Sequence, residues 1–287
     1  LPAQPLLTPH RPSSIRRPWG FCLPHRLRER LPDGEYEVRI DADLEPGNLT
    51  YGELVLPGTS GRELLISCHV CHPQLANDNL SGLVVTAFLA RHLAGLGERR
   101  LGLRFLWIPG TIGSITWLAR NESRLDRVAA GLVAANLGDS GFFHFKRSRR
   151  GDRWIDRTVA HVLASSGLEH RLLDFEPFGY DERQYGSPGF DLPVGCLSRT
   201  PWGSYPEYHT SGDDLDLVRP SSLAESLAVY DRIVRLLEED RRLLNLSPKG
   251  EPQLGRRGLY RSLGGSAARE RELALLWVLN QSDGHHT

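Results

Sequence analysis

From residue 64 onward, short apolar segments alternate with segments whose apolar residues recur at helical spacing, and this alternation constrains the fold more than any other feature. The expected strands are continuous apolar runs, whereas a strand with one face in water would alternate apolar and polar residues. Continuous runs separated by helices are typical of a largely parallel sheet with helices on both faces, so we expect an α/β protein. The expected strands are residues 64–70, 101–108, 131–137 and 171–175, and the expected helices are residues 81–96, 113–120 and 157–166.

The segments around this core differ from it in composition. Residues 1–35 are rich in proline and arginine and indicate an extended lead-in, followed by short expected strands at 36–40 and 49–56. Residues 177–206 form a long polar stretch rich in glycine and proline, more loop than a compact domain usually contains without a functional purpose. A long amphipathic helix is expected at 221–243, and another helix begins at residue 270.

Charge and composition exclude several classes of protein. Lys and Arg together number 35, as do Asp and Glu, so the formal net charge is zero and the global balance favours neither a nucleic-acid nor a membrane partner. No apolar run approaches the roughly 20 residues that a membrane helix needs, and a cytoplasmic protein is expected. The 4 cysteines are too few and too irregularly spaced for a disulfide framework, so Cys68 and Cys71 are expected to be small buried residues.

The loop between the first expected strand and its helix contains the densest group of reactive side chains. The sequence there is Ser-Cys-His-Val-Cys-His-Pro-Gln-Leu-Ala-Asn-Asp-Asn-Leu-Ser-Gly, residues 67–82. His69, His72 and Asp78 lie where a strand ends and a helix begins, the edge at which open α/β folds bind ligands. Imidazole and carboxylate are donors that a divalent metal such as zinc prefers, so we expect a metal site here. Asp78 alone has a second interpretation as a helix cap.

A second group surrounds His209, between the long loop and the last helix of the core. His209 could complete the metal site from the opposite side, with Asp213 and Asp214 orienting its second ring nitrogen. The alternative is an acidic surface turn. The neighbouring Tyr208 is a candidate for contact with substrate.

Four further charged residues are candidates for catalysis or binding. Asp181 and Glu182 lie in the long loop and could supply a metal ligand or a general base, although surface loops carry such pairs routinely. Arg199 could bind a substrate carboxylate or form a structural ion pair. Asp139 follows the expected strand at 131–137 and is a further candidate metal ligand.

These motifs resemble the aminopeptidase-like DUF4910 family, distant relatives of the M28 zinc aminopeptidases. The most specific part runs from His69 through Gly82, and weaker similarity covers residues 17–22, 49–53, 109–114, 181–185 and 208–211. The resemblance implies a three-layer α/β/α sandwich with a mostly parallel mixed sheet and one or two zinc ions at the strand ends. It also implies Asp78 as a bridging carboxylate and His209 as a late histidine ligand. The first histidine is His69 or His72, and the His-Pro pair favours His72.

The resemblance also sets expectations for the domains and the ends of the chain. Residues 1–48 would be a lead-in, the remnant of a small accessory β domain, and residues 49–246 the aminopeptidase-like domain. Residues 247–287 would be a linker and the start of a truncated, winged-helix-like segment. Because methionine is absent, even at position 1, we expect the chain to be a fragment.

One departure from the family bears on activity. The family pattern Pro-Glu-Thr-Ile-Gly-Ser stands here as residues 109–114 with Gly110 in place of the glutamate, which is the implied general base. Losing a positioned base typically costs about 10²–10⁴-fold in rate. Two hypotheses follow: a zinc-dependent hydrolase of an amide bond in a small peptide or aminoacyl conjugate, or a catalytically impaired module that binds such a ligand. A deacylase on the same scaffold differs only in substrate, and a homo-oligomer is compatible with either hypothesis.

Overall fold

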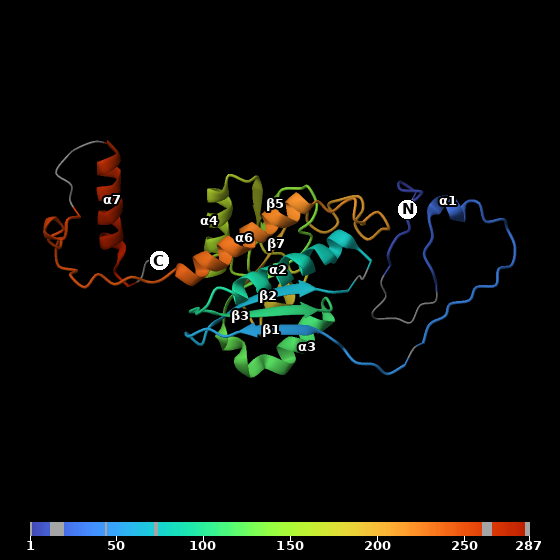
Figure 1. The fold of residues 1–287 in the computed structure, drawn as a ribbon. Helices are drawn as coiled ribbons and strands as arrows, with labels where there is room; N and C mark the ends of the chain where they lie inside the picture. Colours follow the sequence, from blue (N-terminus) through green and yellow to red (C-terminus); the bar gives the residue numbers. More distant parts are fainter. Residues whose placement is uncertain (1, 12–19, 44, 72–73, 260–265, 285–287) are drawn as a thin grey trace. The chain divides into compact units, whose positions relative to one another are not determined.

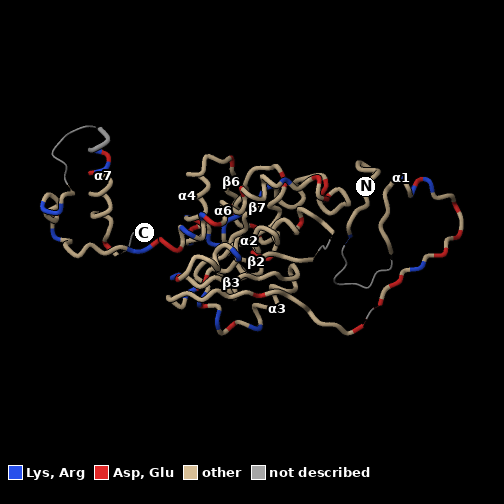
Figure 2. Tube along the Cα trace, in the orientation of Figure 1, with Lys and Arg blue, Asp and Glu red and all other residues tan. Residues whose placement is uncertain are grey.

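A computed structural model describes residues 2–11, 20–43, 45–71, 74–259 and 266–284. The chain divides into two units, Leu1–Glu238 and Glu239–Thr287. Charged residues of both signs are interspersed along the chain (Figure 2). No helix of the described residues is long and apolar enough to cross a membrane.

The first unit is built on a mixed sheet whose order is β1-β3-β2-β4-β7-β5-β6. Four neighbouring pairs, β2–β3, β2–β4, β4–β7 and β5–β6, are parallel, while β1–β3 and β5–β7 are antiparallel. The sheet is therefore mostly parallel, as expected. The strands are β1 (Gly52–Leu56), β2 (Glu63–His69), β3 (Gly102–Ile108), β4 (Val128–Ala134), β5 (Phe143–Lys146), β6 (His170–Leu173) and β7 (Val194–Ser198).

Helices cover both faces of this sheet (Figure 1). One core cluster joins alternate residues of β2, β3 and β4 to α2 (Gly82–Ala94), α4 (Trp154–Ser166) and α6 (Pro220–Glu239). The other cluster joins the intervening residues to α3 (Ile112–Asn121) and α5 (Glu182–Tyr185). The expected three-layer α/β/α sandwich is confirmed.

The two-sided covering explains why the central strands are continuous apolar runs. In β2, Leu64 and Ile66 point to the first cluster and Leu65 to the second, and all three are buried. Full burial of each such side chain contributes about 1.5–3 kcal/mol. A polar side chain on either face of β2 would need a hydrogen-bond partner between the sheet and the helices that cover it.

Three sequence expectations about strands are corrected. Residues 36–40 form no strand; their apolar side chains alternate, but Tyr36, Val38 and Ile40 are all exposed and have no sheet edge to pair with. Two strands, β5 and β7, lie where no strand was expected. Both are short, and β7 lies within the glycine- and proline-rich stretch, so neither has a periodic signal.

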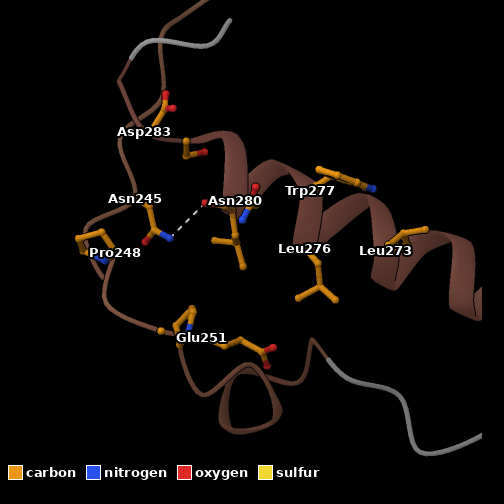
Figure 3. A pocket seen from close by; sticks show the side chains of 12 residues that line it. Asn245, Pro248, Glu251, Leu273, Leu276, Trp277, Asn280 and Asp283 are labelled. Atoms are coloured by element: carbon orange, nitrogen blue, oxygen red, sulfur yellow. Dashed lines mark hydrogen bonds between the residues drawn. The ribbon is translucent and has the colours of Figure 1, made fainter.

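The second unit contains η3 (Gly255–Arg257) and α7 (Ser266–Gln281). A cavity of about 580 Å³ lies between the segment around Asn245–Glu251 and one face of α7, with Leu273, Leu276 and Trp277 on its helix side (Figure 3). Asn245 joins the two sides, because its backbone N–H donates to Ser282 O and its side chain to Leu279 O.

Candidate metal and catalytic site

The sheet topology opens a crevice at the carboxyl ends of β2 and β3. These strands are parallel neighbours, but β2 is followed by α2 on one face of the sheet and β3 by α3 on the other. Loops that leave adjacent strands toward opposite faces separate from each other, and ligands bind in the resulting crevice. His69 is the last residue of β2, and Gly110 comes two residues after β3.

A buried turn, Ala76–Ser81, carries Asp78 into this crevice; we call it the site turn. The side chain of Asn79 donates to Ala134 O at 2.8 Å and accepts from Asn136 N and Gly82 N. Ser81 Oγ donates to Asn77 O and accepts from Leu137 N. These contacts fasten the site turn to the end of β4.

Gly82 permits this close approach. A Cβ at this position would lie 2.5 Å from Asn79 Oδ1 and 2.8 Å from Ala134 O, distances that no real side chain tolerates. The side chains of the Asn-Asp-Asn-Leu-Ser-Gly segment thus hold the site turn in place and leave the carboxylate of Asp78 available for other partners.

Asp78 lies between two imidazoles. Its Oδ1 is 2.8 Å from His69 Nε2, and its Oδ2 is 3.1 Å from His209 Nε2. Asp78 and His69 are 0% and 3% exposed, whereas His209 is 27% exposed, so the group is accessible only from the His209 side. The structure therefore brings together three sequence-predicted ligands, and Asp78 is not a helix cap.

The site turn is also held from the His209 loop. Asp213 accepts from the backbone N–H of Asn77 at 2.5 Å and of Asp78 at 3.0 Å, and Tyr205 OH donates to the same carboxylate at 3.1 Å. Burial raises the pKa of Asp213. Asp213 was expected to orient His209, but it orients the backbone beneath Asp78 instead. Asp214 accepts from Asp216 N in a local exposed turn.

Two tyrosines stack on the two imidazoles. Tyr180 lies parallel to His69 with ring centroids 4.5 Å apart, and Tyr208 lies parallel to His209 at 4.1 Å. Burial raises the pKa of both phenols, so both are neutral and keep their protons for hydrogen bonding. Tyr208 was predicted as a substrate contact; Tyr180 was not singled out, because only the folded chain brings it onto His69.

Asp181 lies beside the crevice and is fully buried. Its Oδ1 accepts from Ser114 Oγ at 2.8 Å, while its Oδ2 accepts no hydrogen bond from the described residues. Burial raises the pKa of Asp181 to about 6. A Cβ built on Gly110 would lie 3.7 Å from this Oδ2 and 2.9 Å from His69 Cβ, so Gly110 lies between the two side chains.

Glu182 points to a different partner from its neighbour Asp181. It forms an ion pair with Lys146 at 2.6 Å and is 1% exposed, and Lys146 also donates to Phe178 O. The two adjacent acidic residues of the long loop therefore have separate roles in the structure.

Arg199 and Asp139 are both engaged in contacts that hold the fold. Arg199 pairs with Glu225 and donates to Gly141 O and to Ser226 Oγ, which fits the structural ion pair considered from the sequence. Asp139 accepts from Asn77 Nδ2 at 2.9 Å and from Thr200 Oγ1 at 2.5 Å. It supports the site turn from below.

His72, the favoured first histidine, lies outside the described residues. Cys71 is exposed, so the expectation that it is a buried residue was wrong, whereas Cys68 is buried as expected. Within the described residues, no three His, Cys, Asp or Glu side chains are already gathered as a metal site.

The N-terminal segment reaches the site, which the sequence did not indicate. Its backbone pairs with the His209 loop through His10 N to His209 O at 2.7 Å and Ser211 N to Thr8 O at 2.8 Å. The His10 ring meets the His209 ring edge-on with centroids 5.4 Å apart. Burial and the neighbouring His209 lower the pKa of His10. A third imidazole thus lies against the exposed side of the site.

Comparison with known proteins identifies the family. Residues 8–240 match the family model described as a domain of unknown function, DUF4910. The chain belongs to the DUF4910 family. The resemblance expected from the motifs is confirmed, and residues 241–287 match a separate model described as a winged helix-turn-helix.

Several relatives and solved structures are similar to this DUF4910 chain. A Clostridium acetobutylicum protein described as a polysaccharide biosynthesis protein with an aminopeptidase-like domain is 45% identical over 280 residues, which cover 97% of this chain and 64% of that protein. A crystal structure from the same organism, of a protein described as a peptidase, is 43% identical with a TM-score of 0.90 over 100% of this chain and 64% of the other. This chain thus spans less than two thirds of the length of either relative.

More distant structures share the fold. A zinc aminopeptidase from Bacillus subtilis has a TM-score of 0.57 at 15% identity, over 70% of this chain and 51% of its own. An M28 peptidase precursor from Shewanella amazonensis has a TM-score of 0.54 at 19% identity, over 66% of this chain and 44% of its own. At these identities the likeness shows the α/β/α fold and carries no residue roles.

Proposed function

We propose that this chain is a zinc-dependent, aminopeptidase-like hydrolase that cleaves an amide bond in a small peptide or aminoacyl conjugate. In this proposal His69, Asp78 and His209 hold the metal and Asp181 is the general base. The observation that carries the proposal is the buried carboxylate of Asp78 with an imidazole nitrogen at each oxygen.

The donor set fits zinc. Two neutral imidazoles and an ionised carboxylate are the ligand types of catalytic zinc sites, which keep a further position for water or substrate. His69, Asp78 and His209 would hold one zinc ion or two, with Asp78, which has an imidazole nitrogen near each oxygen, as the shared ligand. Zinc bound there would polarise a substrate carbonyl and lower the pKa of a water molecule.

Asp181 is the group best placed to replace the missing glutamate. Its Oδ2 faces Gly110, where the glutamate side chain of the family pattern would begin, and accepts no hydrogen bond from the described residues. Its Oδ1 is fixed by Ser114 Oγ, so the free oxygen is held in one orientation. In the ionised form Oδ2 would accept a proton from the attacking water and return it to the leaving amine. Glu182 is less suited, because Lys146 neutralises it.

The substrate class is inferred from the entrance and from the relatives. The open side of the site is flanked by Tyr208, stacked on His209, whose phenol could donate to a carbonyl oxygen. Relatives are described as having an aminopeptidase-like domain or as a peptidase, which supports an amide substrate. Arg199 is engaged in structural contacts, so other residues would recognise the substrate.

Hydrolysis of aminoacyl anilides tests this proposal directly. We expect the purified chain to release the aniline in a reaction that a chelator stops and zinc restores. Asp181→Asn should keep its zinc but lower kcat/KM by about 10²–10⁴-fold, while Asp126→Asn, at an exposed position after α3, should not change it. Zinc binding without turnover in the wild type would instead support the impaired binding module that Gly110 suggests.

A further inference from the structure

A second concave site lies at the β5–β6 end of the sheet. Its volume is about 910 Å³, and its lining comes from β5 and the residues just before it, from β6, and from the segments that follow β6 and β7. None of the groups proposed for metal binding or catalysis lines it. Its floor and walls differ in chemistry.

The floor is one face of β5 and β6, and three of its side chains, His144, Lys146 and Arg171, are polar. The parallel register places His144 beside Arg171 and Lys146 beside Leu173, while Phe143 and Phe145 point the other way into the core. His144 Nδ1 lies 2.7 Å from Arg199 O and must donate to it, so Nε2 carries the lone pair of the neutral ring.

Most charges around the floor are already neutralised. Lys146 is paired with Glu182, and Asp174 is paired with Arg147 at 3.1 Å. Arg171 has no carboxylate partner among the described residues; its guanidinium lies over the Phe142 ring at 6.0 Å. Glu176 also lines the pocket and is exposed. Arg183 lies over the Phe178 ring at 5.9 Å but does not line the pocket. Arg171 is thus the lining arginine without a carboxylate partner among the described residues, and with Glu176 nearby it suits a single negative charge better than a phosphate dianion.

The walls present aromatic surface. Phe178 and Trp202 meet edge-to-face with centroids 4.7 Å apart, and Phe178 is 58% exposed. A large aromatic side chain left open in a concave site is a surface that a flat apolar group can cover.

The pocket and the proposed catalytic site share their loops. Phe178 precedes Tyr180 and Asp181 by two and three residues in the same segment, and Trp202 lies in the segment that continues to Tyr208. Lys146, on the pocket floor, holds the residue that follows Asp181. The segments that supply Phe178 and Trp202 to this pocket are therefore the same ones that supply Tyr180, Asp181 and Tyr208 to the proposed catalytic site.

We propose that this pocket binds the carboxyl-terminal aromatic residue of a short peptide, with Arg171 pairing to the free carboxylate and Phe178 and Trp202 packing against the ring. This specificity rests on the proposed function, because it assigns the pocket to the leaving side of the cleaved amide. It makes aromatic dipeptides with a free carboxylate the preferred substrate class.

Direct binding separates this proposal from the hydrolase proposal. The probes are N-acetylphenylalanine, which has no free amine for an aminopeptidase to act on, and its carboxamide, titrated calorimetrically into metal-depleted protein. We expect the acid to bind at least about tenfold more tightly than the amide, a difference of about 1.4 kcal/mol. N-acetylalanine should bind at least about tenfold more weakly than N-acetylphenylalanine.

Variants assign the contacts. Arg171→Gln should weaken binding of the acid about tenfold and leave binding of the amide unchanged. Trp202→Ala should weaken both, and Arg91→Gln, at an exposed position on α2, should weaken neither. Equal affinities for acid and amide, equal losses for both in Arg171→Gln, or no saturable binding up to about 10 mM would overturn the proposal. Binding as expected without any anilide hydrolysis would remove the hydrolase proposal and leave the pocket assignment standing.

Discussion

The buried carboxylate of Asp181 makes the stability of the protein depend on pH in a predictable direction. Burial raises its pKa from 3.8 to about 6, so between these values the folded chain binds a proton that the unfolded chain has lost. The contribution of the Asp181 carboxyl to the free energy of unfolding is fully present below about pH 4 and is lost as the pH rises to about 6. The shift of about two units corresponds to about 3 kcal/mol at 1.36 kcal/mol per unit.

Asp181→Asn isolates this contribution. Asparagine keeps an oxygen that accepts from Ser114 Oγ, and it carries no charge at any pH. The free energy of unfolding of the variant should therefore not fall in this way as the pH rises. We expect the difference in free energy of unfolding between variant and wild type, from urea titrations of metal-depleted protein, to shift by about 3 kcal/mol in favour of the variant between pH 4 and pH 7. Asp174→Asn should show no such shift, since that side chain is 90% exposed. A pH-independent difference for Asp181→Asn would refute the reasoning.

Three further substitutions test the surroundings of the site. His10→Ala removes the ring that lies against His209 and should weaken zinc binding by about tenfold, measured by competition with a chromophoric chelator; unchanged affinity would exclude a role for this ring. Asp213→Asn replaces one of the two carboxylate oxygens by an NH2 group, which cannot accept from the backbone N–H that faces it in the site turn. This variant should lower the free energy of unfolding by about 2–3 kcal/mol in urea titrations, and a loss near zero would contradict the assigned contacts. Gly110→Ala introduces a Cβ 2.9 Å from the β2 histidine and should cost about 1–3 kcal/mol, whereas Gly189→Ala, with nothing within 4 Å, should be neutral; equal effects would show that the crevice has room for a side chain.

The central strands could be predicted because burial on both faces leaves a strong local signal. β2 and β3 were located to within two residues from their apolar runs. β5 and β7 could not be, because they are short and their pairing partners come from distant parts of the sequence. Residues 36–40 show the converse: an alternating pattern forms no strand without a neighbouring edge.

The site was predictable where its residues form one local motif. His69 and Asp78 are nine positions apart, and the Asn, Ser and Gly residues between and after them have individually explained contacts. The stacking of Tyr180 on His69 and the contact of His10 with His209 depend on pairs separated by more than a hundred residues. No local spacing indicates such contacts, so only the fold reveals them.

Zinc stoichiometry tests the central claim most directly. Purified chain and two variants, Asp78→Asn and the exposed-site control Asp126→Asn, would be equilibrated with zinc by dialysis and analysed by mass spectrometry for metal content. The account predicts one or two zinc ions per chain in the wild type and the control, and loss of that zinc in Asp78→Asn, because the carboxylate between the two imidazoles is the shared ligand. Zinc content that is equal in all three proteins, or absent from the wild type, would contradict it.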